Sequence, residues 1–600
     1  MATTLASATT AAGGSFLLNE TDPDAIFTPE DFTDEQQQIA ATAAEFAAKE
    51  VLPAAAEIEA KHFDVTRALL KKAGDLGLMA VDIPEAYGGL AMDKVTSAII
   101  ADRMSVLASF SVAFSAHAGI GTLPIVWYGT DAQKEKYLPK LATGEWIAAY
   151  ALSEASSGSD AMSLRTRAVL DGDHYVLNGE KMWITNAGFA DLFTVFAKIV
   201  DPAEPDLSKT KISAFLIERT TPGLTIGAEE HKLGIRGSST CPLILSDCRI
   251  PAANLLGEAG KGHHIAFNIL NIGRFKLGAA CVGGARTSLS NAVSYAKERK
   301  AFGKSISEFG LIQQKIADAA TRIYVGESMA YRTVGMIDAA LAGVEDSRSI
   351  QKGIEEYAIE CSILKVWGSE MLDAVVDHTV QIYAGYGYVE EYPAERAYRD
   401  SRINRIFEGT NEINRLIISG FLMKRAMSGQ LPLLAAIKSV MDEIMSPPSF
   451  SEPNESEDPL AREAQMLQNA KKLALFAAGS ASQKYMNALA DQQEIMAALA
   501  DILIEIYALD SALARARKLA SRDSPKAGLA AQMTQLYAEK SFHAIEAAAR
   551  EVVAAVAEGD MLRTQLAVLR RLVKHEPANT IALSRAIAQK TIDLNHVSMA

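Results

Sequence analysis

Glu408 lies where a carboxylate could act as a general base. The apolar pair Ile406–Phe407 precedes it and Gly409 follows it. A carboxylate in a water-poor pocket has a raised pKa, which brings it closer to working pH and suits it to proton abstraction. The missing side chain at Gly409 would let a substrate approach the backbone. A structural alternative stays open, because Glu408 could instead cap a helix or pair with Arg402 or Arg405.

Further motifs that could carry chemistry fall into three ordered groups. They are Tyr150–Asp160 with Lys181–Asn186, then Asn271–Arg274 with Lys297–Gly303, and last Gln381–Gly387 with Arg399–Asp400 and Ile406–Glu412. Two other signals are weak. Gly303-Lys304-Ser305 resembles the end of a phosphate-binding loop, but Glu298 stands where that motif needs glycine. The adjacent His263 and His264 would point about 100° apart on a helix and cannot readily share a metal.

Composition limits the class of protein. The 600 residues are 49% hydrophobic, 22% charged and 7% aromatic, which is ordinary for a soluble globular enzyme. The net charge of −14 argues against nucleic acid as the main partner. Four cysteines without a CxxC pair do not form a disulfide framework or zinc site, so we expect a reducing compartment and no metal.

Membrane and targeting signals are not expected either. The chain has no uninterrupted apolar stretch of about 18 residues, so no spanning helix is predicted. Its first basic residue is Lys49, which fits neither a secretory signal nor a mitochondrial presequence. The sequence therefore predicts a cytoplasmic protein.

The motifs must be positioned by helices, then strands, then helices. Thr33 and Gln36 can form a capping box, and helical periodicity continues over 67–76, 93–114 and 131–141. Short β-branched and aromatic runs at 175–177, 193–199, 212–217 and 243–245 predict a compact antiparallel β domain. Long helical runs at 265–298, 312–341 and 353–383 suit an antiparallel bundle. The predicted units are a disordered or loosely packed leader (1–30), a helical domain (31–147), a β domain (148–255), a helical bundle (256–430), a linker (431–460) and a C-terminal helical domain (461–600).

Together, the three motif groups and the α–β–α order resemble the acyl-CoA dehydrogenase family over about residues 30–430. The helical extension and the run Asn268–Phe275 resemble its very-long-chain branch. The resemblance implies a mainly α fold with a central antiparallel β domain, a helical bundle and an additional C-terminal helical domain. It also implies FAD-dependent dehydrogenation of long-chain acyl-CoA to trans-2-enoyl-CoA in fatty-acid β-oxidation. Glu408 would remove the α-proton, the hydride would pass from Cβ to the flavin, and electrons would go to electron-transfer flavoprotein.

The resemblance also implies roles for individual residues. Cofactor-binding positions in the family match Tyr150, Leu152, Ser153, Trp183, Thr185, Arg299, Gln381, Gly385, Thr410 and Glu412. Substrate-binding positions match Ser159, Asn271, Arg274 and Gly409, with Arg274 expected near the adenosine phosphate of CoA. Arg299, Gln381 and Gly385 match residues that hold the FAD pyrophosphate of a neighbouring subunit, which implies at least a homodimer.

Some positions depart from the family pattern. Ser153 stands where Thr is usual, Asn271 replaces a common Asp, and Ala301 and Gly310 stand where shorter-chain members carry Thr and Gln contacts to FAD. FAD affinity would then depend more on the remaining contacts.

Several alternatives stay open. The small residues Ala113, Ser115, Ala116 and Gly119 could widen an acyl pocket or only allow tight helix packing. The basic residues Arg563, Arg570, Arg571 and Lys574 could contact a membrane surface or form a solvated bundle face. Rival functions are an acyl-CoA oxidase that uses O₂ and a non-catalytic assembly or scaffold protein on the same fold. The negative charge argues against a DNA-associated flavoprotein.

Overall fold

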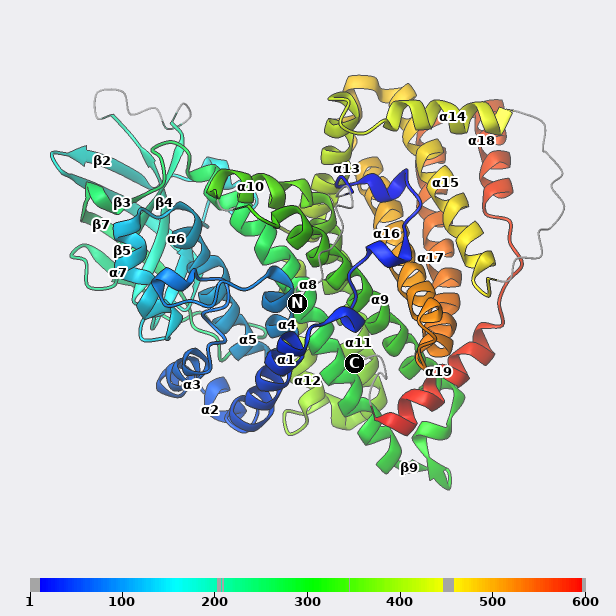
Figure 1. Cartoon of the computed structure of the whole chain (residues 1–600), viewed down its shortest axis with the longest axis horizontal. Coiled ribbons are helices and arrows are strands. Elements are labelled where there is room, and N and C mark those ends of the chain that lie inside the picture. The colour runs from blue at the N-terminus through cyan, green and yellow to red at the C-terminus, as the bar shows by residue number, and fades with distance from the viewer. Residues whose placement is uncertain (1–10, 202–206, 208–209, 345, 446–457, 596–600) are drawn as a thin grey trace.

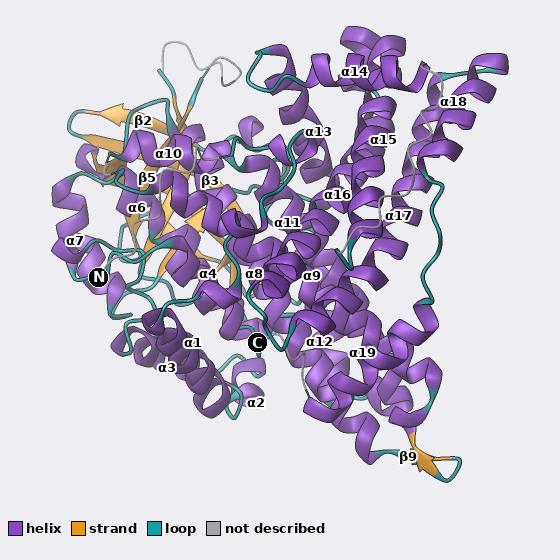
Figure 2. Cartoon of the chain, turned by 45° about the vertical axis from the view of Figure 1, so that its right-hand side comes forward, coloured by secondary structure: helices purple, strands orange, loops and turns teal. Residues whose placement is uncertain are grey.

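The computed structural model describes residues 11–595 except 202–206, 208–209, 345 and 446–457. Helices precede and follow one sheet, and the C-terminal helices lie on the far side of the central bundle from that sheet (Figures 1 and 2). The mainly helical fold with a central β domain and an additional C-terminal helical domain, as expected from the sequence, is confirmed.

The first helical region begins at the predicted capping box, where Thr33 and Gln36 exchange side-chain-to-backbone hydrogen bonds. A π-helical turn, Ala116–Gly121, lies between α5 and α6. The helices of this region are α1 Asp34–Phe46, α2 Ala55–Glu59, α3 Phe63–Asp75, α4 Lys94–Arg103, α5 Ala108–Ser115, α6 Leu123–Tyr128 and α7 Asp131–Ala142.

The sheet is mixed, which corrects the expectation of an antiparallel one. Its order is β6-β7-β3-β2-β4-β5-β8, and β1 also pairs with β4. Both β1 and β2 run parallel to β4 and lie one after the other along it, because the loop 152–166 leaves the sheet and returns to it. The strands are β1 Ala148–Ala151, β2 Arg167–Asp171, β3 His174–Thr185, β4 Leu192–Ile199, β5 Ile212–Glu218, β6 Leu224–Ile226, β7 Thr240–Pro251 and β8 Leu255–Leu256.

The bundle is built on two long helices that approach closely. A Cβ at Gly278 of α8 would lie 2.4 Å from Cγ of Leu364 on α11, so only glycine permits this spacing. A small hairpin, β9 Lys300–Ala301 and β10 Lys304–Ser305, projects after α8 (Figure 1). The helices are α8 Gly262–Glu298, α9 Gly310–Leu341, α10 Ser347–Glu356, α11 Ala358–Tyr383, α12 Pro393–Ser401 and α13 Asn411–Met427.

The expected linker is helical in its first part. Residues Leu433–Met445 form α14 because the apolar residues of this stretch recur at helical spacing. Ile437 of α14 packs against Gly479 of α15. Residues 446–457 of that linker lie outside the described residues. The remaining helices are α15 Ala461–Tyr485, α16 Gln493–Ser521, α17 Ala527–Val556, α18 Gly559–Leu572 and α19 Thr580–Leu594.

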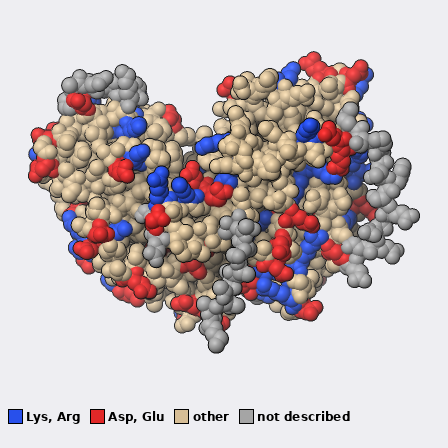
Figure 3. Space-filling model, turned by 45° about the horizontal axis from the view of Figure 1, so that its top comes forward, with Lys and Arg blue, Asp and Glu red and all other residues tan. Residues whose placement is uncertain are grey.

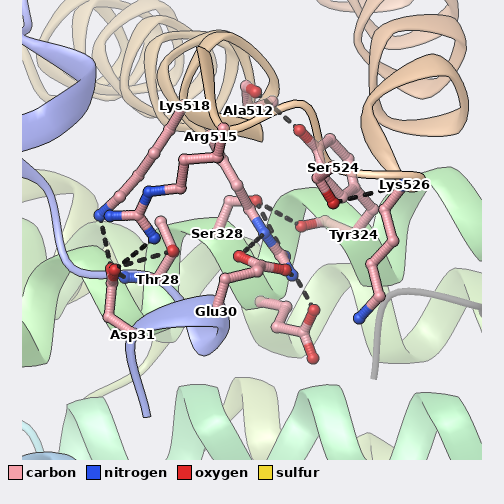
Figure 4. A network of polar contacts seen from close by, with 12 residues as sticks. Thr28, Glu30, Asp31, Tyr324, Ser328, Ala512, Arg515, Lys518, Ser524 and Lys526 are labelled. Carbon is pink, nitrogen blue, oxygen red and sulfur yellow. Dashed lines mark hydrogen bonds and ion pairs between the residues drawn. The ribbon is translucent and has the colours of Figure 1, made fainter. Parts of the chain in front are cut away.

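Residues 11–33 form an N-terminal strap that contacts both the central bundle and the C-terminal helices, which corrects the expectation of a loose leader over this stretch. The ring of Phe16 is buried 4.9 Å from that of Tyr507 on α16. Figure 4 shows Arg515 and Lys518 of α16 reaching the strap, where Arg515 pairs with Glu30 at 2.6 Å and Lys518 with Asp31 at 2.5 Å. Apolar burial and ion pairs together order this segment. Residues 1–10 of the expected leader lie outside the described part.

Two helical stretches are long and apolar enough to cross a membrane by composition alone. They are Ala108–Tyr128 and Gly262–Glu298, and 83% and 78% of their apolar windows are buried in this fold, so they are interior helices here. On the surface, basic and acidic side chains are interspersed over the face in Figure 3.

Candidate active site

Glu408 lies in a left-handed turn just before α13. Its φ is 59° and that of Gly409 is 80°, and such a conformation is costly for a residue with a side chain. The carboxylate lies against the backbone of Gly273 on α8, and its buried Oε2 has no hydrogen-bond partner among the described residues. Burial raises the pKa of Glu408 to about 7, although Arg274 and Lys365 act to lower it.

The structural alternatives for Glu408 do not match these contacts. Thr410, not Glu408, caps α13 by accepting a hydrogen bond from the amide of Ile413. Arg405 pairs instead with Asp373, at 2.7 Å. Glu408 is therefore a buried carboxylate in a strained turn, which is an arrangement typical of a catalytic base.

Several buried donors hold the carbonyl groups of this turn. Arg274 Nε donates to the Glu408 carbonyl at 3.3 Å, and Lys365 Nζ donates to the Gly409 carbonyl at 2.7 Å. Asn414 Nδ2 donates to the carbonyls of Gly409 and Thr410 at 2.8 and 3.0 Å. The turn is thus fixed from α8, α11 and α13.

Arg274 and Asn271 lie behind the turn that carries Glu408. Both are buried, and Arg274 Nη1 donates to Asn271 Oδ1 at 2.7 Å. The guanidinium faces the carbonyl of Glu408, so this geometry gives no support to the expected contact with a phosphate.

The residues expected on the sheet come together at the end of β1. Tyr150 lies in β1, near its end, and Leu152 follows the strand directly. Lys181 Nζ donates to the Leu152 carbonyl at 3.2 Å. Met182 N donates to the Ser153 carbonyl at 3.0 Å, which places Ser153 beside β3. Burial raises the pKa of Tyr150, and the charge of Glu408 adds to that shift, so these two residues face the same region.

Trp183 is directed out of the sheet by an irregularity in β3. The register shifts between Lys181 and Ile184, and Trp183 has φ 59° and a side chain that is 56% exposed. A bulge of this kind re-aims a side chain. The exposed indole of Trp183 therefore offers a flat aromatic surface on β3, next to the point where Ser153 pairs with Met182.

The expected pyrophosphate residues do not join this group. Arg299 directly follows the C-terminal end of α8, whereas Gly273, which contacts Glu408, lies in its N-terminal third. At a rise of 1.5 Å per residue, the two positions are about 39 Å apart along the helix. Arg299, Gln381 and Gly385 are exposed, and the guanidinium of Arg299 lies 5.7 Å from the ring of Tyr386. One chain therefore carries two separated sets of expected cofactor residues. Ser159 is exposed in the loop 152–166, while Thr410 and Glu412 lie at the start of α13.

Sequence reasoning missed Lys365 and Asn414. Lys365 is fully buried on α11 and Asn414 is fully buried on α13. The available signal was a lysine inside the apolar run Ser362–Trp367, where a charge has to find a specific partner.

Comparison with known proteins agrees with this architecture. Family models described as the N-terminal, middle and C-terminal domains of acyl-CoA dehydrogenase match residues 33–145, 149–248 and 260–423. A further model, also described as an acyl-CoA dehydrogenase C-terminal domain, matches residues 469–571.

Individual relatives extend over nearly the whole chain. A probable acyl-CoA dehydrogenase of Bacillus subtilis is 48% identical over 96% of each chain. The crystal structure of an acyl-CoA dehydrogenase complexed with FAD from Bacillus anthracis has a TM-score of 0.94 and 47% identity, covering 98% of this chain and all of that one. The human mitochondrial very long-chain specific enzyme is 43% identical over 58% of this chain and 51% of that protein.

The fold and site define a flavin-dependent oxidoreductase. The chain belongs to the acyl-CoA dehydrogenase family. The cofactor expected from the sequence, FAD, is the one bound in the Bacillus anthracis structure.

Proposed function

We propose that this chain dehydrogenates long-chain acyl-CoA at Cα–Cβ to the trans-2-enoyl-CoA, with Glu408 as general base. The observation that carries the proposal is the buried, unpaired Oε2 of Glu408 in a turn held by three donor side chains. Its pKa of about 7 allows the carboxylate to accept a proton near neutral pH.

The chemistry requires more than a base. FAD, when bound, supplies a hydride acceptor, which no side chain can provide. Because the α C–H of a thioester is a very weak acid, the developing enolate oxygen needs donors aimed at it. The backbone N–H of Glu408 is the donor we propose for the thioester carbonyl, and Gly409 leaves room for the acyl group beside it.

Cofactor and substrate contacts follow from the two separated sets of residues. In one chain Tyr150, Leu152, Ser153, Trp183, Thr185, Thr410 and Glu412 would hold FAD near Glu408. Arg299, Gln381 and Gly385 would reach the FAD of a second copy, so the enzyme would be a homodimer. Ser159 would contact CoA, whereas Asn271 and Arg274 would support the turn from behind.

Long-chain preference has two supports. Ala116 and Gly119 are buried small residues in the π-helical turn, and Ala113 is buried in α5 just before it. A Cβ at Gly119 would lie 3.8 Å from Cδ of Lys276 on α8. The human mitochondrial relative described as very long-chain specific is 43% identical to the matched part of the chain. We propose electron-transfer flavoprotein as the electron acceptor and the cytoplasm as the location of the enzyme. Contact between a membrane surface and the basic face of α18 is an additional hypothesis.

An anaerobic titration with palmitoyl-CoA tests the function. Palmitoyl-CoA should bleach the oxidised-flavin absorbance of the wild type, and E408Q should not respond, whereas the exposed control E391Q should bleach fully. Equal bleaching of E408Q would refute the role of Glu408.

The same assay separates the alternatives. Comparing butyryl-CoA with palmitoyl-CoA tests the chain-length preference, and rapid O₂ consumption during turnover would favour an oxidase. A wild type that holds FAD but responds to neither thioester would favour the scaffold.

A further inference from the structure

Lys365 is a buried cation that has no carboxylate partner. It lies on α11 with 0% of its surface exposed, and no ion pair joins it to a carboxylate in the described part of the chain. Its Nζ donates instead to the carbonyl of Gly409 at 2.7 Å and to Oδ1 of Asn411 at 2.8 Å. Burying an ammonium group without a counter-charge is expensive, so these two acceptors are specific partners rather than incidental contacts.

Both acceptors belong to the segment that carries Glu408. Gly409 is the second left-handed residue of the turn, and Asn411 is the first residue of α13. Lys365 therefore joins the turn to the helix that follows it. Arg274 and Asn414 also hold carbonyls of the turn, but only Lys365 among these three bridges Gly409 and Asn411.

Asn411 is linked to the C-terminal helical domain through Glu370 of α11 and Arg415 of α13. Its Nδ2 donates to Glu370 Oε1 at 2.9 Å, and Glu370 accepts from both terminal nitrogens of Arg415 at 2.9 and 3.1 Å. Arg415 Nε then donates to Asp501 of α16 at 2.7 Å. The contacts of Lys365 thus continue from the turn into α16.

We propose that Lys365 is a positioning residue for Glu408. Its ammonium group holds the strained turn in place and sets a positive charge behind the carboxylate that removes the substrate proton. The inference rests on the proposed role of Glu408 as base.

The charges around the two residues give the proposal a signature in pH. Burial raises the pKa of Glu408, and Arg274 from α8 and Lys365 from α11 oppose that rise, while Tyr150 faces it from the sheet. Burial lowers the pKa of Lys365 to about 8, Glu408, Cys281 and Glu412 act to raise it, and Arg274 lowers it further. Lys365 is therefore mostly charged at neutral pH, and its removal should raise the pKa of Glu408 further.

The test compares K365M with K471M in the full-length, FAD-loaded protein. Lys471 is a second buried lysine, on α15, where its Nζ donates to the carbonyl of Asn19. In K365M we expect kcat for palmitoyl-CoA to fall about 10- to 100-fold, with KM changed less than about 3-fold. The acidic limb of the kcat/KM profile should move up by about one pH unit. K471M should lower the melting temperature and leave that limb in place.

A structural readout accompanies the kinetics. Hydrogen–deuterium exchange over residues 406–414 should accelerate in K365M and not in K471M. If K365M does not fold, K365Q provides the same test, because its amide fills part of the space and can donate but carries no charge. A folded Lys365 variant with an unshifted acidic limb, kcat within twofold of wild type and unchanged exchange would overturn the proposal. The proposed role of Glu408 is tested separately, by flavin bleaching in the wild type and its absence in E408Q. A failure of the Lys365 proposal can therefore be distinguished from a failure of the proposed function.

Discussion

The carboxylate of Glu408 lies so close to Gly273 that a Cβ at position 273 would stand 2.5 Å from Oε2 and 2.7 Å from Cδ. Gly273 is helical, so its missing side chain makes room for Glu408 and serves no unusual backbone conformation. A side chain at position 273 would therefore have to displace the carboxylate of Glu408.

This contact predicts that Gly273→Ala separates activity from folding. The methyl group meets only the end of a flexible side chain, and alanine favours a helix over glycine by about 1 kcal/mol. We expect the melting temperature to be retained, whereas kcat for palmitoyl-CoA should fall about 100-fold because the carboxylate is displaced. Gly284→Ala on the same helix is the matched control, since its Cβ would meet nothing closer than 3.6 Å. Full activity in both variants would show that the carboxylate need not occupy its present position.

The buried state of Glu408 predicts the pH dependence of kcat/KM. As the proposed base, Glu408 would act only when ionised, and its pKa is raised from 4.5 to about 7. The logarithm of kcat/KM should therefore rise with a slope of about one below pH 7 and level off above it. Steady-state assays between pH 5 and pH 9 would measure the limb. A limb near the ordinary value for a glutamate would mean that the carboxylate is solvated in the working enzyme.

The strap contacts predict a large difference between two arginine variants. Arg515 is fully buried and pairs with Glu327 at 2.8 Å and with Glu30 at 2.6 Å. Removing one partner of a buried ion pair costs about 3–5 kcal/mol, so R515M should lower the urea midpoint strongly. Arg563 pairs with Asp560 at 2.8 Å where the side chains are 82% and 94% exposed, and R563A should change stability by less than about 1 kcal/mol. Similar midpoints for both variants would contradict a tightly seated strap.

The cysteines predict an unreactive native protein. Cys241, Cys248, Cys281 and Cys361 are buried and free, and burial raises the pKa of Cys281 and Cys361 to about 12. A thiol-specific chromogenic reagent should react slowly with the folded chain and rapidly with all four thiols in denaturant. Fast modification of even one thiol under native conditions would show that its helix or strand opens readily.

Local features of this fold were predictable, while several long-range ones were not. The capping box at Thr33 and the extent of α9 follow from patterns of a few residues, because both depend on local periodicity. The parallel pairing of β1 and β2 with β4 depends on the path of the loop 152–166, which strand-like composition does not encode.

The candidate site shows the same division. Glu408 stands out in sequence because of its apolar neighbours, and its motif resembles a known family. Lys365 does not stand out in the sequence, because its hydrogen-bond partner is a carbonyl 44 residues away along the chain. The burial of Arg274 likewise depends on the packing of α8 against the turn that carries Glu408, which local sequence patterns do not predict.

The strap has a consequence for how the chain is made. Glu30 and Arg515 are 485 residues apart, so a ribosome releases the strap long before its binding helix exists. At about 5–20 residues per second, Phe16 and the acidic residues of the strap wait roughly half a minute or more for α16. The contacts between the strap and α16 therefore form only on a chain that has been synthesised almost to its end. Until α16 has emerged, Phe16 lacks its partner ring on Tyr507, and a chain unfinished at that point would expose this apolar side chain to chaperones and proteases.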